Sequence, residues 1–210
     1  NGVAHQRITK LLVATNEAQV PKLKAIQETA IRNGVTDLQP LMGNEARAIE
    51  PEVSCVAALL SPSTGTIDTH AYMLALEGHV EARGGNVVLN TPVERVSRRA
   101  DGLFEVVTAG EAPATITAKE LVLSPGLHAT KLARTMGFPS GYTPPETYYA
   151  VGQYYAYTGR SPFSRHIYPM PDGAWLGLHV TVDLGGRCKF GPDIEWIPEI
   201  DYTFKPEKLE

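Results

Sequence analysis

The sequence predicts a mixed α/β (α+β) fold whose strands pair mostly in antiparallel fashion. Helical and strand-like apolar patterns alternate in the first half, three strand patterns separated by turn residues follow, and strand patterns dominate after residue 148. With 210 residues, the chain is long enough for one large domain or one and a half ordinary ones. We therefore expect a sizeable core and long-range strand pairing.

The first third predicts two strands and two helices. Residues 10–15 form an apolar run typical of a buried strand, and residues 16–33 follow a helical pattern that begins at an asparagine cap and stops at Gly34. A short helix over 44–49 and an apolar strand over 56–60 come next.

The middle third predicts a helix, a β-meander and a second helix. The first helix is capped by Asp68 or Thr69 and ends at two glycines, 84–85. Strands over 86–96, 103–108 and 115–123 are separated by turn residues. The helical pattern over 126–136 ends at a glycine, Gly137, as the first helix does. The last third predicts strands over the ranges 148–157, 165–169, 175–184 and 187–190.

Composition and charge exclude several functional classes. The net charge is −4 with a pI near 5.9, and the basic residues form no coherent stripe, which argues against a nucleic-acid partner. No run approaches the ~18 apolar residues that cross a membrane. The two cysteines, Cys55 and Cys188, are interpreted as reduced thiols of a cytoplasmic protein.

The segment 175–184 contains a histidine that could act in catalysis. Strand alternation places Leu176, Leu178, Val180, Val182 and Leu184 on one face. The opposite face then carries Gly177, His179, Thr181 and Asp183. An imidazole titrates near neutrality and can take a proton from a hydroxyl or an amine. The alternative is a half-buried histidine on a solvated sheet face.

Further polar residues of the last third suit a pocket wall. Tyr168 precedes the His179 strand, and alternation places Gln153 beside Val151 and Tyr155 on one strand face. Arg165 lies beside a proline-containing turn and could bind a carboxylate through both of its terminal nitrogens, or be solvated.

Several well-known motifs are missing from the sequence. The histidines and cysteines show no metal-ligand spacing, so no metal site is expected. There is no G-x-S-x-G motif, no P-loop and no G-x-G-x-x-G motif after a strand. The chain therefore carries no dinucleotide anchor of the usual kind.

Five segments in consistent order resemble the D-amino-acid-oxidase-like flavoenzymes, and among them the L-2-hydroxyglutarate dehydrogenase branch. Residues 65–76 (GTIDTHAYMLAL) resemble the family's entry to a helix, and residues 91–96 (TPVERV) its adenine-contacting strand. Residues 121–129 (LVLSPGLHA) resemble a strand-to-helix turn beside the cofactor. Residues 167–171 (IYPMP), with residues 176–181 (LGLHVT), resemble a pair of strands over the flavin.

The resemblance implies an FAD site and a domain plan. FAD contacts would come from Val93, Ser124, Pro125 and Gly126, although Pro125 lacks the backbone donor of the usual Ala-Ala-Gly turn. Residues 1–70 and 141–208 would form the substrate-binding domain, with 71–140 contributing to the FAD-binding part. The last two residues, 209–210, read as a tag scar on a piece of a longer polypeptide.

The resemblance also implies a function. The whole protein would oxidise a small 2-hydroxy acid to a 2-oxo acid, with His179 as the base and Tyr168, Thr181 and Gln153 around the substrate. We expect this chain alone to bind FAD weakly and to be inactive. Trp175 stands where amine-oxidising relatives carry a lysine, and Val151 where many relatives carry a basic residue. An amine-oxidising enzyme, a non-catalytic binding module, a partner-dependent subunit and a degraded relative remain alternatives.

Overall fold

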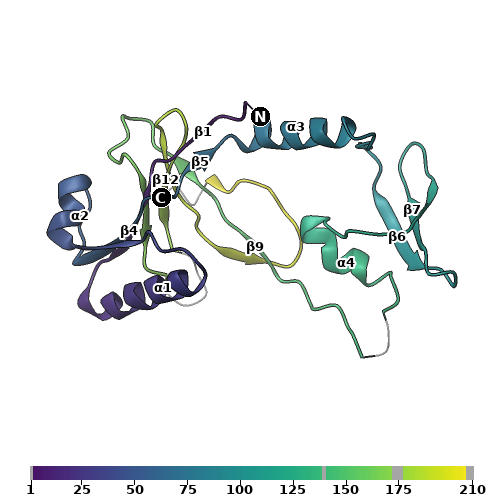
Figure 1. Ribbon diagram of the computed structural model, residues 1–210, viewed down its shortest axis with the longest axis horizontal. Coiled ribbons are helices and arrows are strands. Elements are labelled where there is room, and N and C mark those ends of the chain that lie inside the picture. The colour runs from purple at the N-terminus through teal and green to yellow at the C-terminus, as the bar shows by residue number, and fades with distance from the viewer. Residues whose placement is uncertain (1, 139–140, 172–176, 207–210) are drawn as a thin grey trace. The chain divides into compact units, whose positions relative to one another are not determined.

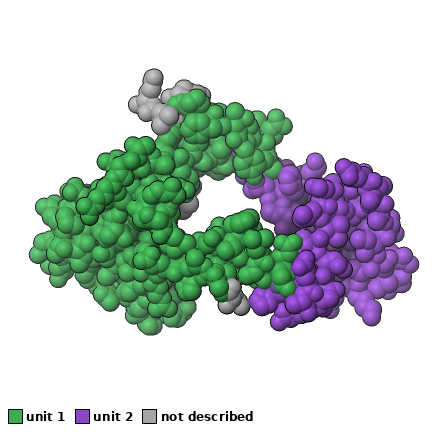
Figure 2. All heavy atoms as spheres, turned by 90° about the horizontal axis from the view of Figure 1, so that it is seen from above, with its two compact units in different colours: residues 1–78, 150–210 green, residues 79–149 purple. Residues whose placement is uncertain are grey.

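The computed structural model describes residues 2–138, 141–171 and 177–206, which form two compact units (Figure 2). Unit 1 comprises residues 1–78 and 150–210, and unit 2 comprises residues 79–149. Unit 2 overlaps the predicted insert, residues 71–140, whose assignment to the FAD-binding part stays a prediction. Helix α3 (Thr69–Glu81) runs without a break from unit 1 into unit 2.

Unit 1 is built on a seven-stranded sheet with the strand order β10-β13-β12-β11-β2-β4-β3. All neighbouring strands are antiparallel except β11 and β2, which are parallel. This parallel pair joins the first and last thirds of the chain, and the predicted largely antiparallel sheet is confirmed. The strands are β2 (Lys10–Ala14), β3 (Gln39–Met42), β4 (Ala57–Ser61), β10 (Tyr155–Ala156), β11 (His166–Pro169), β12 (His179–Val182) and β13 (Cys188–Gly191).

One helix packs on each face of this sheet (Figure 1). We call the two faces the α2 face and the α1 face, after α2 (Gly43–Ile49) and α1 (Val20–Arg32). Because side chains alternate along a strand, Leu11 packs on the α2 face with Ala46, whereas Leu59 packs on the α1 face with Leu23. Each large aliphatic side chain buried in this way contributes about 1.5–3 kcal/mol.

The α1 face has an apolar half and a polar half. Helix α1, which follows the short 3-10 turn η1 (Glu17–Gln19), packs against β2 and β4. Over β11 and β12, the same face carries polar and aromatic side chains instead. This polar half becomes the candidate site.

Two small sheets complete unit 1. β1 (His5–Gln6) pairs with β5 (Thr66–Ile67), and β9 (Tyr149–Val151) pairs with β14 (Glu195–Ile197). The predicted single strand over 148–157 is interrupted at residues 152–154. Its first part pairs with β14 and its last part with β13, and between them a Cβ at Gly152 would lie 2.8 Å from the Asp193 carbonyl oxygen.

Helix α3 has the predicted start and an unexpectedly exposed apolar face. The Asp68 carboxylate accepts a hydrogen bond from the Ala71 amide at 3.0 Å, as an N-cap does. Tyr72, Leu76 and Val80, predicted to share one packed face, are 44–48% exposed. The described part of the chain therefore does not bury this face.

Unit 2 contains the predicted meander of β6 (Val93–Arg98), β7 (Phe104–Thr108) and β8 (Thr115–Ala118). The first strand is shorter than predicted because Asn90 has a positive φ of 53° and Pro92 follows it. The predicted helix 126–136 is a 3-10 turn, η2 (Gly126–His128), followed by α4 (Ala129–Ala133).

Candidate active site

The polar half of the α1 face is organised in two rows across strands β2, β11 and β12. In the observed register, His166 lies opposite Lys10, and Ile167 lies opposite Val180. Lys10, His166 and Thr181 consequently share one row. Leu12, Tyr168 and His179 share the next. The sheet therefore brings together three predicted site residues, Tyr168, His179 and Thr181.

Tyr168 and His179 form a stacked pair. Their ring centroids are 3.8 Å apart and their planes differ by 1°. His179 is 6% exposed and Tyr168 is half-buried. Burial raises the pKa of the Tyr168 phenol, and Tyr154 raises it further. Tyr168 therefore keeps its proton at neutral pH and can donate a hydrogen bond.

His166 is a buried, neutral histidine beside this pair. Its Nδ1 accepts a hydrogen bond from the Val182 amide at 3.1 Å, so the ring carries its proton on Nε2. Burial lowers the pKa of His166, and the positive charge of Lys10 lowers it further. The sequence showed no reason to single out this residue, because its partner lies 16 positions away.

Lys10 places a half-buried cation at the same face. Its Nζ lies 5.1 Å from the centroid of the Tyr168 ring, in a cation–π arrangement, and burial lowers its pKa. Sequence reasoning treated Lys10 as the start of a buried strand. The sequence did contain one signal for Lys10, namely a charged residue at the start of an otherwise apolar strand.

Tyr154 is a second residue that sequence reasoning missed. An unbroken strand would place Gln153 and Tyr155 together on one face. Because the strand is interrupted at residues 152–154, that alternation does not fix the position of Tyr154. A Cβ at Gly191, the residue opposite His179, would lie 2.9 Å from the Tyr154 Cδ1. Glycine at 191 therefore lets the Tyr154 ring approach the strand next to His179.

The side chain of Gln153, a predicted pocket residue, is engaged within the protein. It is buried, and its side-chain amide donates to the Tyr155 hydroxyl and to the Lys205 carbonyl oxygen, each at 3.3 Å. The Lys205 amide donates to its Oε1. These contacts hold the C-terminal segment, so we propose a structural role for Gln153 in place of substrate binding.

Arg165 is likewise engaged within the protein. Its Nε donates to the buried Glu50 carboxylate at 3.2 Å, and its terminal nitrogens donate to the Ile49 carbonyl and the Thr9 hydroxyl. Glu50 also accepts hydrogen bonds from the Ser164 amide and hydroxyl. The contacts to Glu50 and Ile49 direct Arg165 toward the C-terminal end of α2, so we propose that it is a structural residue.

The predicted alternation over 175–184 holds only in β12 itself. Val180 and Val182 are buried on the α2 face, but Leu178 is 47% exposed. Asp183 belongs to a turn, where its carboxylate accepts hydrogen bonds from the Gly185 and Arg187 amides. Trp175 and Leu176 lie outside the described residues.

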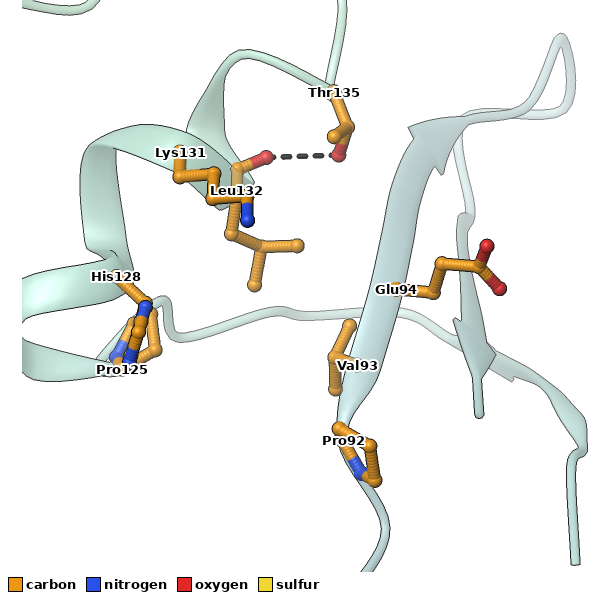
Figure 3. A pocket seen from close by; sticks show the side chains of 8 residues that line it. All are labelled: Pro92, Val93, Glu94, Pro125, His128, Lys131, Leu132 and Thr135. Carbon is orange, nitrogen blue, oxygen red and sulfur yellow. Dashed lines mark hydrogen bonds between the residues drawn. The ribbon is translucent and has the colours of Figure 1, made fainter. Parts of the chain in front are cut away.

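Unit 2 contains a cavity of about 430 Å³ between β6 and α4 (Figure 3). Val93 and Pro125, two of the predicted FAD contacts, line it, and Leu132 points into it. Ser124 and Gly126, the other two, are exposed and do not line it. The Thr135 hydroxyl donates a hydrogen bond to the Leu132 carbonyl and accepts one from the Val96 amide, which connects α4 to β6.

The cavity fits one end of a flat cofactor. Its volume lies in the range of small-molecule sites, roughly 300–1,000 Å³. Its walls include Val93, Pro125 and Leu132, which suit an aromatic ring, and His128 and Lys131 supply basic groups. β6 is an edge strand of its sheet, so backbone groups on its open side are available to a ligand.

Comparison with known proteins identifies the family. The profile of the DAO family, described as FAD dependent oxidoreductase, matches residues 2–210. The chain belongs to the DAO family. A mitochondrial L-2-hydroxyglutarate dehydrogenase of Arabidopsis thaliana is 34% identical over an alignment of 247 positions that covers 99% of this chain and 51% of the plant protein. The L-2-hydroxyglutarate dehydrogenase of Escherichia coli K12 is 26% identical, over 92% of this chain and 45% of that protein.

Solved structures of oxidases share the fold. L-α-glycerophosphate oxidase from Mycoplasma pneumoniae, solved with FAD bound, superposes with a TM-score of 0.83 at 25% identity, covering 97% of this chain and 54% of that one. Glycine oxidase from Geobacillus kaustophilus gives a TM-score of 0.76 at 17% identity, covering 98% of this chain and 52% of that one. The predicted family and fold class are confirmed, and the chain spans about half the length of the relatives it matches.

Two further predictions concern membranes and metals. Within residues 2–138, 141–171 and 177–206, no helix has the length and apolar character needed to cross a membrane. In the same part of the chain, no three His, Cys, Asp or Glu side chains are grouped as a metal ion requires.

Proposed function

We propose that this chain is the substrate-binding part of an FAD-dependent oxidoreductase that converts an L-2-hydroxyglutarate-like 2-hydroxy acid into a 2-oxo acid. The observation that carries the proposal is the stacked Tyr168–His179 pair on the polar half of the α1 face. The names of the relatives support a hydroxy acid over an amine as substrate.

Each residue of the pair has a distinct task. His179 accepts the proton of the substrate hydroxyl, because a neutral imidazole is a competent base near pH 7. Stacking on Tyr168 fixes the plane of the imidazole. The Tyr168 phenol, kept protonated by burial, and the Thr181 hydroxyl orient the substrate through hydrogen bonds.

Bound FAD would supply the acceptor for the hydride of the substrate α-carbon. In unit 2, Val93 and Pro125 would contact its adenine end in the cavity beside β6, with Ser124 and Gly126 nearby in the chain. Because Pro125 has no backbone N–H, its contribution is apolar contact. Leu132 would cover the same ring.

The proposed reaction is tested with the FAD-loaded full-length protein. We expect L-2-hydroxyglutarate to bleach the flavin absorbance near 450 nm under anaerobic conditions and to yield 2-oxoglutarate. L-glutamate, which carries an amine in place of the hydroxyl, is the matched control and should leave the flavin oxidised. Bleaching by L-glutamate alone would establish the amine-oxidising alternative. A cytoplasmic location remains part of the proposal, tested by cell fractionation.

A further inference from the structure

Lys10 is a cation without a carboxylate partner among the residues that the structure describes. It takes part in none of the ion pairs formed by the residues that the structure describes. Arg165, by contrast, is paired with Glu50. A half-buried ammonium group without a carboxylate partner is costly, because burial removes part of its hydration. Such a group is suited to bind an anion brought by a ligand.

The sheet fixes where that anion would lie relative to His179. Lys10 is on β2, Tyr168 is on β11 between them, and His179 is on β12. The Lys10 Nζ faces the Tyr168 ring at 5.1 Å, and the His179 ring stacks on the same tyrosine at 3.8 Å. Neighbouring strands are ~4.8 Å apart, so the β2 and β12 backbones are separated by about 10 Å.

This spacing selects among carboxylic acids. In a 2-hydroxy acid, the carboxylate next to the reacting carbon lies within one bond of it and stays close to His179. A carboxylate at Lys10 lies beyond Tyr168, toward β2 and away from His179, which requires methylene groups between it and the reacting carbon. The arrangement thus favours an acid with a second, remote carboxylate.

We propose that Lys10 binds the remote carboxylate of a 2-hydroxy dicarboxylic acid whose hydroxyl is presented to His179. The assignment rests on the proposed function for the reaction, and on the position of Lys10 for the choice of substrate. Lys10 is then a specificity-determining residue for that site.

The test compares substrates with and without the remote carboxylate in the FAD-loaded full-length protein. Lys10→Met should lower kcat/KM for L-2-hydroxyglutarate by about 10- to 100-fold, the usual effect of losing one charged hydrogen-bond partner. The kcat/KM for L-2-hydroxybutyrate, which lacks that carboxylate, should change by less than about 3-fold. Lys10→Arg should restore most of the loss, because it keeps the charge.

The matched control is Lys189→Met. Lys189 is exposed on β13, opposite Thr181, so it shares the face and the residue type but lies away from Tyr168. We expect it to leave both substrates nearly unaffected. An equal loss on both substrates in Lys10→Met, or no loss, would overturn the proposal.

A binding measurement separates this inference from the reaction itself. Glutarate, which has no hydroxyl to oxidise, should bind the parent protein in calorimetry and bind Lys10→Met about 10- to 100-fold more weakly. Butyrate should bind both proteins equally. If the parent reduces its flavin with neither hydroxy acid, the proposed function fails while glutarate still decides the role of Lys10. Absence of glutarate binding to the parent would overturn the Lys10 assignment.

Discussion

Replacing Arg165 with methionine should destabilise the protein without weakening substrate binding. Arg165 is 20% exposed and Glu50 is 2% exposed, so the change leaves a buried carboxylate without its arginine partner. Breaking a fully buried pair costs about 3–5 kcal/mol. Glu50 keeps the Ser164 amide and hydroxyl as donors, and Arg165 is partly hydrated, so we expect a loss of about 2–4 kcal/mol.

Urea unfolding at 25 °C measures this loss directly. With a slope of about 2 kcal/mol per molar urea, the midpoint should fall by roughly 1–2 M. The double variant Glu50→Met/Arg165→Met should be more stable than the sum of the two single losses implies, because no unpaired charge is left behind. An unchanged midpoint in Arg165→Met together with a raised KM would refute the structural role and restore the predicted carboxylate clamp.

The remaining predictions concern His166 and the cavity of unit 2. Burial holds the pKa of His166 below its ordinary 6.5, so the unfolded chain takes up the proton first. Stability should fall as the pH drops below about 6.5 and be flat above it. His166→Asn, which retains an acceptor for the Val182 amide, should show a smaller pH dependence in urea titrations at pH 5.5 and 7.5. Leu132→Trp fills the cavity beside Val93 and should raise the FAD dissociation constant of the full-length protein at least ~10-fold, measured by flavin fluorescence. The control Ile116→Trp, on exposed β8, should leave the FAD dissociation constant unchanged. Equal affinities for FAD in both variants would show that the cavity is not part of the cofactor site.

The fold was predictable where local pattern and tertiary pairing agree. The apolar run over 10–15 and the helix start capped by Asp68 are local features, and they appear close to their predicted positions. The helix predicted over 16–33 is present as η1 and α1, but the Asn16 side chain makes no capping hydrogen bond. The strand over 148–157 was predicted unbroken because no local pattern encodes the change of pairing partner, from β14 for β9 to β13 for β10.

The site was predictable only in part, for a similar reason. Period-two alternation placed His179 and Thr181 together, and the resemblance added Tyr168. Lys10 joins them through the parallel pairing of β2 with β11, which connects segments more than 150 residues apart. Gln153 and Arg165 have the right chemistry for a substrate site, but their hydrogen-bond partners in the folded chain are distant in sequence.

The rate of flavin reduction tests the central role of His179 most directly. In anaerobic stopped-flow experiments on the FAD-loaded full-length protein with saturating L-2-hydroxyglutarate, His179→Asn should reduce its flavin ~100-fold more slowly than the parent, the usual scale for a lost general base. Thr203→Ala, at an exposed C-terminal position, should match the parent. A His179→Asn variant that reduces its flavin at the parental rate would contradict the assignment of the stacked imidazole as the proton acceptor.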